Sequence, residues 1–150
     1  MSEVPGQDLL DPGHTTPAGV SDATVDALGK LSEALETVEV ARGHLYAFHQ
    51  LTGSADIALQ GAVDALREAG HDAVAERIRT ELVGRNVIQG RWTFQVVEEY
   101  DDGYWSLFRA LERDAREQLA DGRRHLFEAR LKQDERTDGE PGHEATTPAG

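Results

Sequence analysis

The sequence has no cysteine among its 150 residues, and this absence removes several kinds of chemistry. Without thiols the chain has no disulfide framework, no thiolate nucleophile and no cysteine-ligated zinc or iron–sulfur site. Four short functional patterns are also missing: the GxSxG elbow, the P-loop, the dinucleotide-binding glycine fingerprint and HExxH. These absences favour a protein that is not an enzyme.

Long apolar runs are missing as well. No 18 consecutive residues are apolar, and the first twenty residues have neither the basic segment nor the apolar segment of a signal peptide. We therefore expect a cytoplasmic protein that is not secreted and does not span a membrane. Lysine is also scarce, because Lys30 and Lys132 are the only lysines among 15 basic residues, a bias typical of GC-rich bacterial genomes.

Positive charge is scarce relative to negative charge. The chain has 28 acidic and 15 basic residues, and its net charge is -13. Residues 21–132 carry -6 of this charge, and the short basic stretch from Arg123 to Lys132 is interrupted by Glu128. Since an acidic chain repels phosphate backbones, we expect no nucleic-acid partner.

The two ends of the chain share a near-repeat, PGHTTPAG at 12–19 and PGHEATTPAG at 141–150. Pro, Gly and Thr supply too little apolar area to offset the entropy lost on ordering. We predict disordered tails over 1–20 and 133–150, the second of them acidic, and expect both to be dispensable for folding. A second interpretation is a short linear motif that a protein partner reads twice. Residues 21–132 then form one helical-bundle domain.

A long helix is predicted to begin after Ser21, which suits an N-cap, with Val20 and Val25 in the positions of a hydrophobic staple. Heptad spacing then places seven residues on one side of the helix, which we call the seam: Leu28, Leu31, Leu35, Val38, Arg42, Leu45 and His49. Four neighbours are expected to widen the seam: Ala27, Ala34, Ala41 and Phe48. Thr52-Gly53 is expected to end this helix after about 30 residues.

Two shorter helices are expected next. Ser54 is predicted to cap a helix that runs to Ala69, with Leu59, Val63 and Leu66 on its buried side. Gly70 suits either a turn after this helix or a kink within a longer one. Asp72 is predicted to cap a third helix, whose buried side contains Val74, Ile78 and Leu82.

After a loop indicated by Gly84, Asn86 and Gly90, the stretch WTFQVVEEY has the composition of a strand. A second heptad favours a helix, because it is too long for strand alternation: Phe94, Val97, Asp101, Tyr104, Phe108, Leu111 and Ala115. Gly103 is placed to bend this helix, and Gly122 either ends it or lets it continue to Lys132. The sequence thus predicts an all-α fold, a bundle of three to five helices with a long N-terminal and a long C-terminal helix.

Three polar residues interrupt the two heptads, namely Arg42, His49 and Asp101. Charged side chains avoid such positions unless they are paired. We predict a buried ion pair between Arg42 and Asp101, with His49 hydrogen-bonded nearby, that fixes the register of the two helices.

A metal site inside the bundle is the alternative interpretation of these residues. His49 and Asp101 are its candidate ligands, helped by Glu98, His44 or Asp102. Ferritin-like di-metal proteins hold such carboxylate–histidine sites, but their Glu-x-x-His pairs are missing from both heptads, so the chain resembles them only in architecture. We expect no cofactor, and a divalent metal is the alternative.

Five aromatic residues crowd one short stretch, and packing against the first helix is their simplest role: Trp92, Tyr100, Tyr104, Trp105 and Phe108. Exposed Trp92 and Trp105 would instead indicate a protein-binding surface. The leading hypothesis is a non-enzymatic helical interaction or structural domain, whose partner is another protein or a second copy, since the seam of the first helix is long enough to pair two chains. A metal- or small-ligand-binding bundle is the second hypothesis.

Overall fold

The computed structural model describes residues 9–146, and every regular element among them is helical. Ile88 and Arg91 form an isolated bridge without a strand. The all-α prediction is therefore confirmed, including the helical interpretation of the aromatic stretch after Trp92. The chain divides into two compact units: unit 1 combines residues 1–36 with 108–150, and unit 2 consists of residues 37–107.

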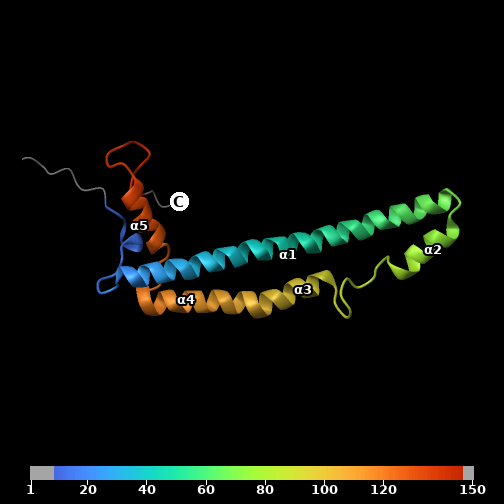
Figure 1. Ribbon diagram of the computed structural model, residues 1–150, viewed down its shortest axis with the longest axis horizontal. Coiled ribbons are helices and arrows are strands. Elements are labelled where there is room, and N and C mark those ends of the chain that lie inside the picture. Colours follow the sequence, from blue (N-terminus) through green and yellow to red (C-terminus); the bar gives the residue numbers. More distant parts are fainter. Residues whose placement is uncertain (1–8, 147–150) are drawn as a thin grey trace, which may run out of the picture. The chain divides into compact units, whose positions relative to one another are not determined.

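The elements follow one another along the chain as labelled in Figure 1. They are the 3-10 helix η1 (Pro12–His14), α1 (Asp22–Glu68), α2 (Asp72–Glu81), α3 (Thr93–Tyr100), the π-helical segment η2 (Asp101–Trp105), α4 (Ser106–Ala120) and α5 (Leu126–Glu135). α1 is the predicted long N-terminal helix, and the unbroken stretch α3–η2–α4 is the predicted long C-terminal one. Both pass from one unit into the other.

Unit 1 has a small apolar core formed by α1, α4 and α5 (Figure 1). The predicted start of α1 is confirmed, since the Ser21 hydroxyl accepts a hydrogen bond from the amide of Thr24 at 3.1 Å and Val20 packs on the core that contains Val25. The core consists of Val25, Leu28, Ala120 and Leu126, with Ala115 and Phe127 packed against them.

The described parts of both predicted tails make contacts in unit 1, which differs from the predicted disorder. Arg123 donates to the carbonyl of Thr15, and Pro17 is buried. The buried Arg136 side chain binds Asp138 at 2.9 Å, and α5 continues to Glu135 rather than ending at Lys132. The rest of both predicted tails lies outside the described residues.

α1 corrects the prediction that a first helix ends at Thr52-Gly53 and that Ser54 caps a second one. The helix continues to Glu68, and the Ser54 hydroxyl donates to the carbonyl of Gln50 at 3.1 Å, one turn earlier, instead of capping an amide. A glycine in a helix interior costs only about 1 kcal/mol relative to alanine. Contacts on both sides of Gly53 offset so small a cost.

The seam continues through the predicted break with the same heptad spacing. Thr52, Asp56, Leu59, Val63 and Leu66 follow His49, and every seam residue from Leu28 to Leu66 is buried or partly buried. The prediction that four neighbours widen the seam is wrong, because these neighbours are exposed: Ala27, Ala34, Ala41 and Phe48. Each directly precedes a seam residue and so lies about 100° away from it around the helix.

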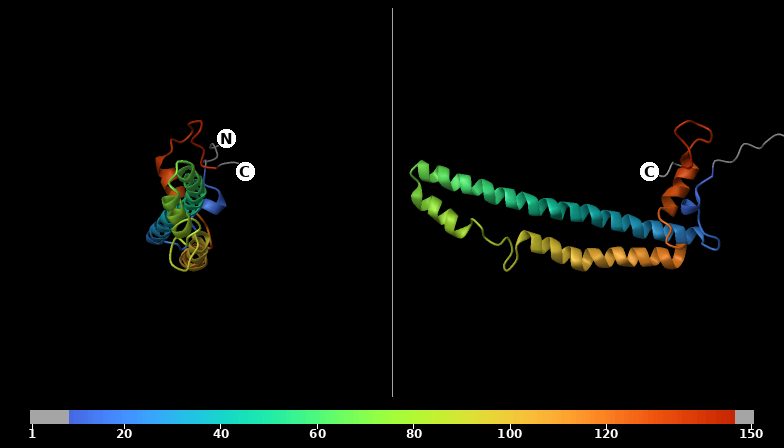
Figure 2. Two further views of the ribbon diagram at one scale, coloured as in Figure 1. Left: turned by 90° about the vertical axis from the view of Figure 1, so that its right-hand side faces the viewer. Right: turned by 180° about the vertical axis from the view of Figure 1, so that it is seen from behind.

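Within unit 2, α2 and then α3 run back along α1, as both Figure 1 and the right panel of Figure 2 show. Gly70, with φ of 87°, makes the turn and is not a kink. His71 N donates to the Leu66 carbonyl at 2.8 Å and Gly70 N to the Arg67 carbonyl at 2.9 Å, which is the Schellman arrangement. Asp72 is not the predicted cap, because it is already the first residue of α2.

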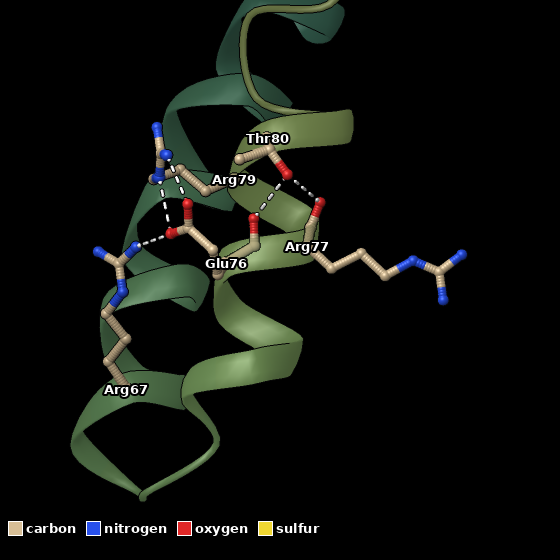
Figure 3. A network of polar contacts seen from close by, with 5 residues as sticks. All are labelled: Arg67, Glu76, Arg77, Arg79 and Thr80. Carbon is tan, nitrogen blue, oxygen red and sulfur yellow. Dashed lines mark hydrogen bonds and ion pairs between the residues drawn. The ribbon is translucent and has the colours of Figure 1, made fainter.

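Surface ion pairs tie α2 to the end of α1 (Figure 3). Glu76 of α2 accepts from Arg67 of α1 at 2.9 Å and from Arg79 of its own helix at 2.7 Å. The pKa of Glu76 is lowered, first by the hydrogen bond from Arg79. These side chains are about half exposed, so the pairs orient α2 more than they stabilise it.

The loop between α2 and α3 is fastened to α1 at one point. Gly84, with φ of 71°, donates its amide hydrogen to the Asp56 carboxylate at 2.9 Å. α3 then begins after Trp92, whose amide is bound by the side chain of Gln95 at 2.9 Å. Gly122, with φ of 71°, ends the long helical stretch after α4 and separates it from α5.

The π-helical segment η2 changes which residues of the C-terminal helix face α1. Because a π turn holds more residues than an α turn, two of the predicted buried positions after Asp101 move by one residue, while Phe108 and Ala115 stay partly buried. Tyr104 and Leu111, predicted to be buried, are each 57% exposed, whereas Trp105 is partly buried and Glu112 is buried. Gly103 lies in this segment, so the predicted irregularity there takes the form of a π turn.

Candidate functional site

The two charged residues that interrupt the heptads meet in the middle of unit 2. Arg42 Nε donates to Asp101 Oδ1 at 2.7 Å, and one terminal nitrogen of Arg42 donates to Asp101 Oδ2 at 2.8 Å. The side chains are 28% and 23% exposed, so the pair is only partly buried, whereas the sequence predicts full burial. A two-point Arg–carboxylate contact fixes both distance and orientation, which sets the register of α1 against η2.

This contact also shifts the ionisation of both groups. The pKa of Asp101 is lowered, first because Arg42 donates a hydrogen bond to the ionised carboxylate, and partial desolvation opposes this effect. The pKa of Arg42 is raised by the same hydrogen bond. Both groups are therefore charged at neutral pH, and the pair is held together by a charge-assisted bond.

Two further contacts show that α1 and α3–η2 are antiparallel. His49 Nδ1 lies 2.7 Å from the hydroxyl oxygen of Thr93, the first residue of α3. Trp105 Nε1 donates to the Glu39 carboxylate at 3.1 Å. As the residue number rises along α1, its partner's number falls along α3–η2.

The proposed metal ligands do not form one site. Arg42 occupies the Asp101 carboxylate, and His49 is bonded to Thr93. His44 precedes a seam residue of α1, whereas Glu98 and Asp102 follow buried positions on the antiparallel helix, so they lie on opposite sides of unit 2. Among residues 9–146, no group of three or more His, Cys, Asp or Glu side chains is arranged to hold a metal ion.

Glu-x-x-His spacing does occur twice outside the heptads, at Glu68 with His71 and at Glu140 with His143. Each pair spans a turn rather than one face of a helix. Ferritin-like di-metal proteins carry this motif inside the bundle. These two pairs therefore do not strengthen the comparison with them.

The two tryptophans have different surroundings. Trp92 is 56% exposed, stacks edge-on with Phe94 at a centroid distance of 5.2 Å, and lines a cavity of about 640 Å³ together with Leu59 and Leu82. Trp105 is partly buried, and its ring lies 4.4 Å from the guanidinium carbon of Arg42. Only Trp92 therefore has the exposure expected of a protein-binding surface.

A row of uncharged side chains follows the seam along α1. Each member directly precedes a seam residue, and together they form a second heptad series. The row consists of Ala41, His44, Phe48, Leu51, Ala55, Ala58, Ala62 and Ala65, all of them exposed.

A matching row lies on the C-terminal helix. Val96, Tyr100, Tyr104 and Leu107 each directly precede a residue that faces α1, with Tyr104 and Leu107 more than half exposed. In both helices, each residue of the row comes one position before a residue that contacts the other helix. The row is therefore rotated by about 100° around each helix, in the same sense relative to the chain direction. Because the helices are antiparallel, this places both rows on the same side of unit 2. We call the two rows together the uncharged face.

The opposite side of unit 2 has a different composition. Its residues directly follow the buried positions and include Glu39, Gln50, Asp64, Glu98 and Asp102, all of them exposed. Tyr46 and Ile57 are its exposed apolar members. On α3–η2 the exposed carboxylates Glu98 and Asp102 thus lie on this side, whereas Asp64 is the only exposed charged residue of α1 between Ala41 and Ala65.

Sequence reasoning missed a buried ionic cluster in unit 1. Glu112 accepts hydrogen bonds from Arg116 at 2.7 Å and from Ser32 of α1 at 3.1 Å. Burial raises the pKa of Glu112, but Arg116 and Ser32 together outweigh burial, and the net shift is downward. The heptad could not predict this cluster, because a regular helix places Leu111 rather than Glu112 inside. The one-residue shift at η2 brings Glu112 there instead.

No family model, curated protein or solved structure matches this chain. Among the described helices, none is both long and apolar enough to cross a membrane.

Proposed function

We propose that this chain is a non-enzymatic helical interaction domain that binds a protein partner through the uncharged face of unit 2. The carrying observation is the second heptad row on α1, whose eight members from Ala41 to Ala65 are all exposed and uncharged. The proposal includes the cytoplasmic location that the sequence suggests.

The composition of the two helices supports this proposal. Unit 2 buries only three apolar side chains fully, Val63, Ala75 and Val97. Large apolar residues on its helices stay exposed instead, with Leu51 at 69% and Leu107 at 59%. Exposed large apolar side chains of this kind are typical of a binding surface.

The seam itself has a different role from the one expected. The sequence suggests that the heptad from Leu28 to His49 pairs two chains. In the structure, Arg42 and His49 of this heptad contact Asp101 and Thr93 of the same chain. The partner-binding role therefore moves to the row next to the seam.

Site-specific photo-crosslinking in cells that make the protein tests the proposal. A photoreactive residue replaces Leu51 on the uncharged face or, as the matched control, its neighbour Gln50 on the opposite side. Crosslinked products of discrete mass from position 51 and none from position 50 are expected. Equal or absent products at both positions would contradict the proposal.

Small-ligand binding is the second candidate, and the cavity beside Trp92 is the observation that favours it. Its volume, about 640 Å³, lies within the range of small-molecule sites. Native mass spectrometry and elemental analysis of the purified protein test this candidate. A co-purifying compound or a stoichiometric divalent metal would support it, and unliganded protein would count against it.

A further inference from the structure

One part of the seam of α1 faces a loop instead of a helix. At one end of this part, His49 contacts the first residue of α3, and beyond the other end α2 runs along α1 (Figure 1). Between them, Thr52, Asp56 and Leu59 face the loop that joins α2 to α3, and Asp56 is bonded to the amide of Gly84 in this loop. The loop covers the seam less completely than a helix does, and a cavity of about 640 Å³ remains between them.

The lining of this cavity combines an apolar part with a few polar groups. The apolar part consists of Leu59, Leu82, Val87 and the exposed ring of Trp92. Side chains that can donate hydrogen bonds belong to Thr52, Arg85 and Asn86. A cavity of this size, mainly apolar and with a small number of polar groups, is typical of a small-molecule site.

Arg85 differs from the other arginines of unit 2. Each of the others binds a carboxylate at 3.3 Å or less: Arg42, Arg67, Arg77, Arg79 and Arg91. Among the described residues, no carboxylate forms an ion pair with Arg85, whose guanidinium makes only a long contact of 3.5 Å with the carbonyl of Glu81. Acidic residues outnumber arginines in this unit. A guanidinium that none of these carboxylates binds is therefore available to an anion from outside the chain.

Hydrogen bonds of the loop backbone hold Arg85 beside the cavity. Gly84 N donates to the Asp56 carboxylate at 2.9 Å, and Arg85 N donates to the Leu82 carbonyl at 3.0 Å. The loop is thus attached to α1 at the residue before Arg85. This arrangement lowers the entropy that ligand binding costs, since the backbone of Arg85 is already ordered.

We infer that this cavity binds a small organic acid that has one carboxylate attached to an aromatic body. The carboxylate pairs with Arg85, whose planar guanidinium matches two carboxylate oxygens, and the aromatic body packs on the ring of Trp92 and on Leu59. One guanidinium without a carboxylate matches one negative charge. Asp56 lines the same cavity and repels a second negative charge, which disfavours phosphate monoesters and other dianions.

This inference rests on the second candidate function, small-ligand binding. It adds the class of ligand and the residue that recognises the ligand. It does not depend on a protein partner at the uncharged face.

Proton–nitrogen correlation NMR of the full chain, titrated with naphthylacetate, tests the inference. The chain has two tryptophans, and Trp92→Phe identifies which of the two indole signals belongs to Trp92. Naphthylacetate should shift this signal and the amide signals of Gly84 and Arg85, and should leave the indole signal of Trp105 unchanged. Naphthylacetamide has the same aromatic body without the charge and should bind at least about tenfold more weakly.

Substitution of Arg85 tests the recognition of the carboxylate. Arg85→Gln should raise the dissociation constant of naphthylacetate at least about tenfold, because the charge-assisted hydrogen bonds are lost. Arg79→Gln is the matched control, since it removes the same charge from α2 at a residue that does not line the cavity, and it should leave the dissociation constant unchanged. Circular dichroism establishes that each variant remains helical.

Three outcomes overturn the inference. Naphthylacetamide binds as tightly as naphthylacetate, or the two arginine substitutions have equal effects; in both cases an aromatic compound still occupies the cavity, and the second candidate function stands. The third outcome is that neither compound gives saturable shifts up to about 10 mM, tenfold above a dissociation constant of about 1 mM. A co-purifying compound found by native mass spectrometry would then support the second candidate function with a ligand of another class.

Discussion

Gly29→Ala tests the packing of unit 1, because the expected result is the reverse of what a helix interior ordinarily gives. Gly29 lies inside α1, where alanine is normally favoured over glycine by about 1 kcal/mol. A Cβ atom at this position would lie 2.7 Å from Phe127 Cγ and 2.8 Å from Phe127 Cβ. These atoms belong to the root of a side chain on α5, so relief requires movement of the helix itself.

The magnitude follows from two opposed effects. Overpacking a filled site costs about 1–3 kcal/mol, and the gain in helix propensity returns about 1 kcal/mol. Gly29→Ala should therefore lower the free energy of unfolding by up to about 2 kcal/mol. Gly53→Ala is the matched control, since a Cβ there meets nothing within 4 Å and should raise that free energy by about 1 kcal/mol.

Urea denaturation followed by circular dichroism measures both variants. The cause is checked in the background of Phe127→Gly, which removes both clashing carbons, so that Gly29→Ala should become favourable there. If Gly29→Ala stabilised the unmodified protein as much as Gly53→Ala does, the close approach of α5 to α1 would be refuted. If Gly53→Ala were destabilising, the continuous helix through Gly53 would be refuted instead.

Four other perturbations have defined outcomes. In a double-mutant cycle of Arg42→Leu and Asp101→Leu, the coupling should be about 1–2 kcal/mol, because the pair is partly exposed, and additive effects would exclude it. The folded pKa of Asp101 is depressed, so the pair's stabilisation is complete above the unfolded pKa near 4 and is lost as pH falls through the folded pKa. Urea titrations at a series of pH values should show this loss, and Asp101→Asn should remove it. Glu112→Leu leaves Arg116 buried without its partner and should cost about 3–5 kcal/mol, whereas adding Arg116→Leu should recover part of this loss in the same assay. Deleting residues 1–19 removes buried Pro17 and should lower the melting temperature measured by calorimetry. Composition alone predicts instead that this segment is dispensable for folding. An unchanged melting temperature would support the prediction from composition.

The parts of the fold that the sequence predicts are those governed by local periodicity. The heptad from Leu28 to His49 is buried or partly buried, and Ser21 caps α1 as its residue type indicates. Arg42 and Asp101 interrupt two apolar patterns, and the structure brings them together. In each case the signal lies within a few turns of helix, where spacing alone decides which side a residue faces.

The predicted break at Thr52-Gly53 is wrong because local turn signals compete with packing. Thr, Gly and Ser are common at helix ends, but here the heptad continues on both sides of them through Asp56 to Leu66. The continuous heptad was the better predictor, since a glycine and two hydroxyl residues cost a helix little once the flanking turns are packed.

The uncharged face depends on two facts that residue types do not encode. The first is the antiparallel direction of α1 and α3–η2, without which the two rows would lie on different sides. The second is the π turn at η2, which has no strong sequence signature. In a regular α-helix, Tyr104 would face α1, and Trp105 would lie among the charged residues of the opposite side. One extra residue in the turn instead brings Trp105 over Arg42 and adds Tyr104 to the uncharged face. The ion pair and the proposed interface thus depend on the same irregularity of the backbone, so removing it should disturb both together.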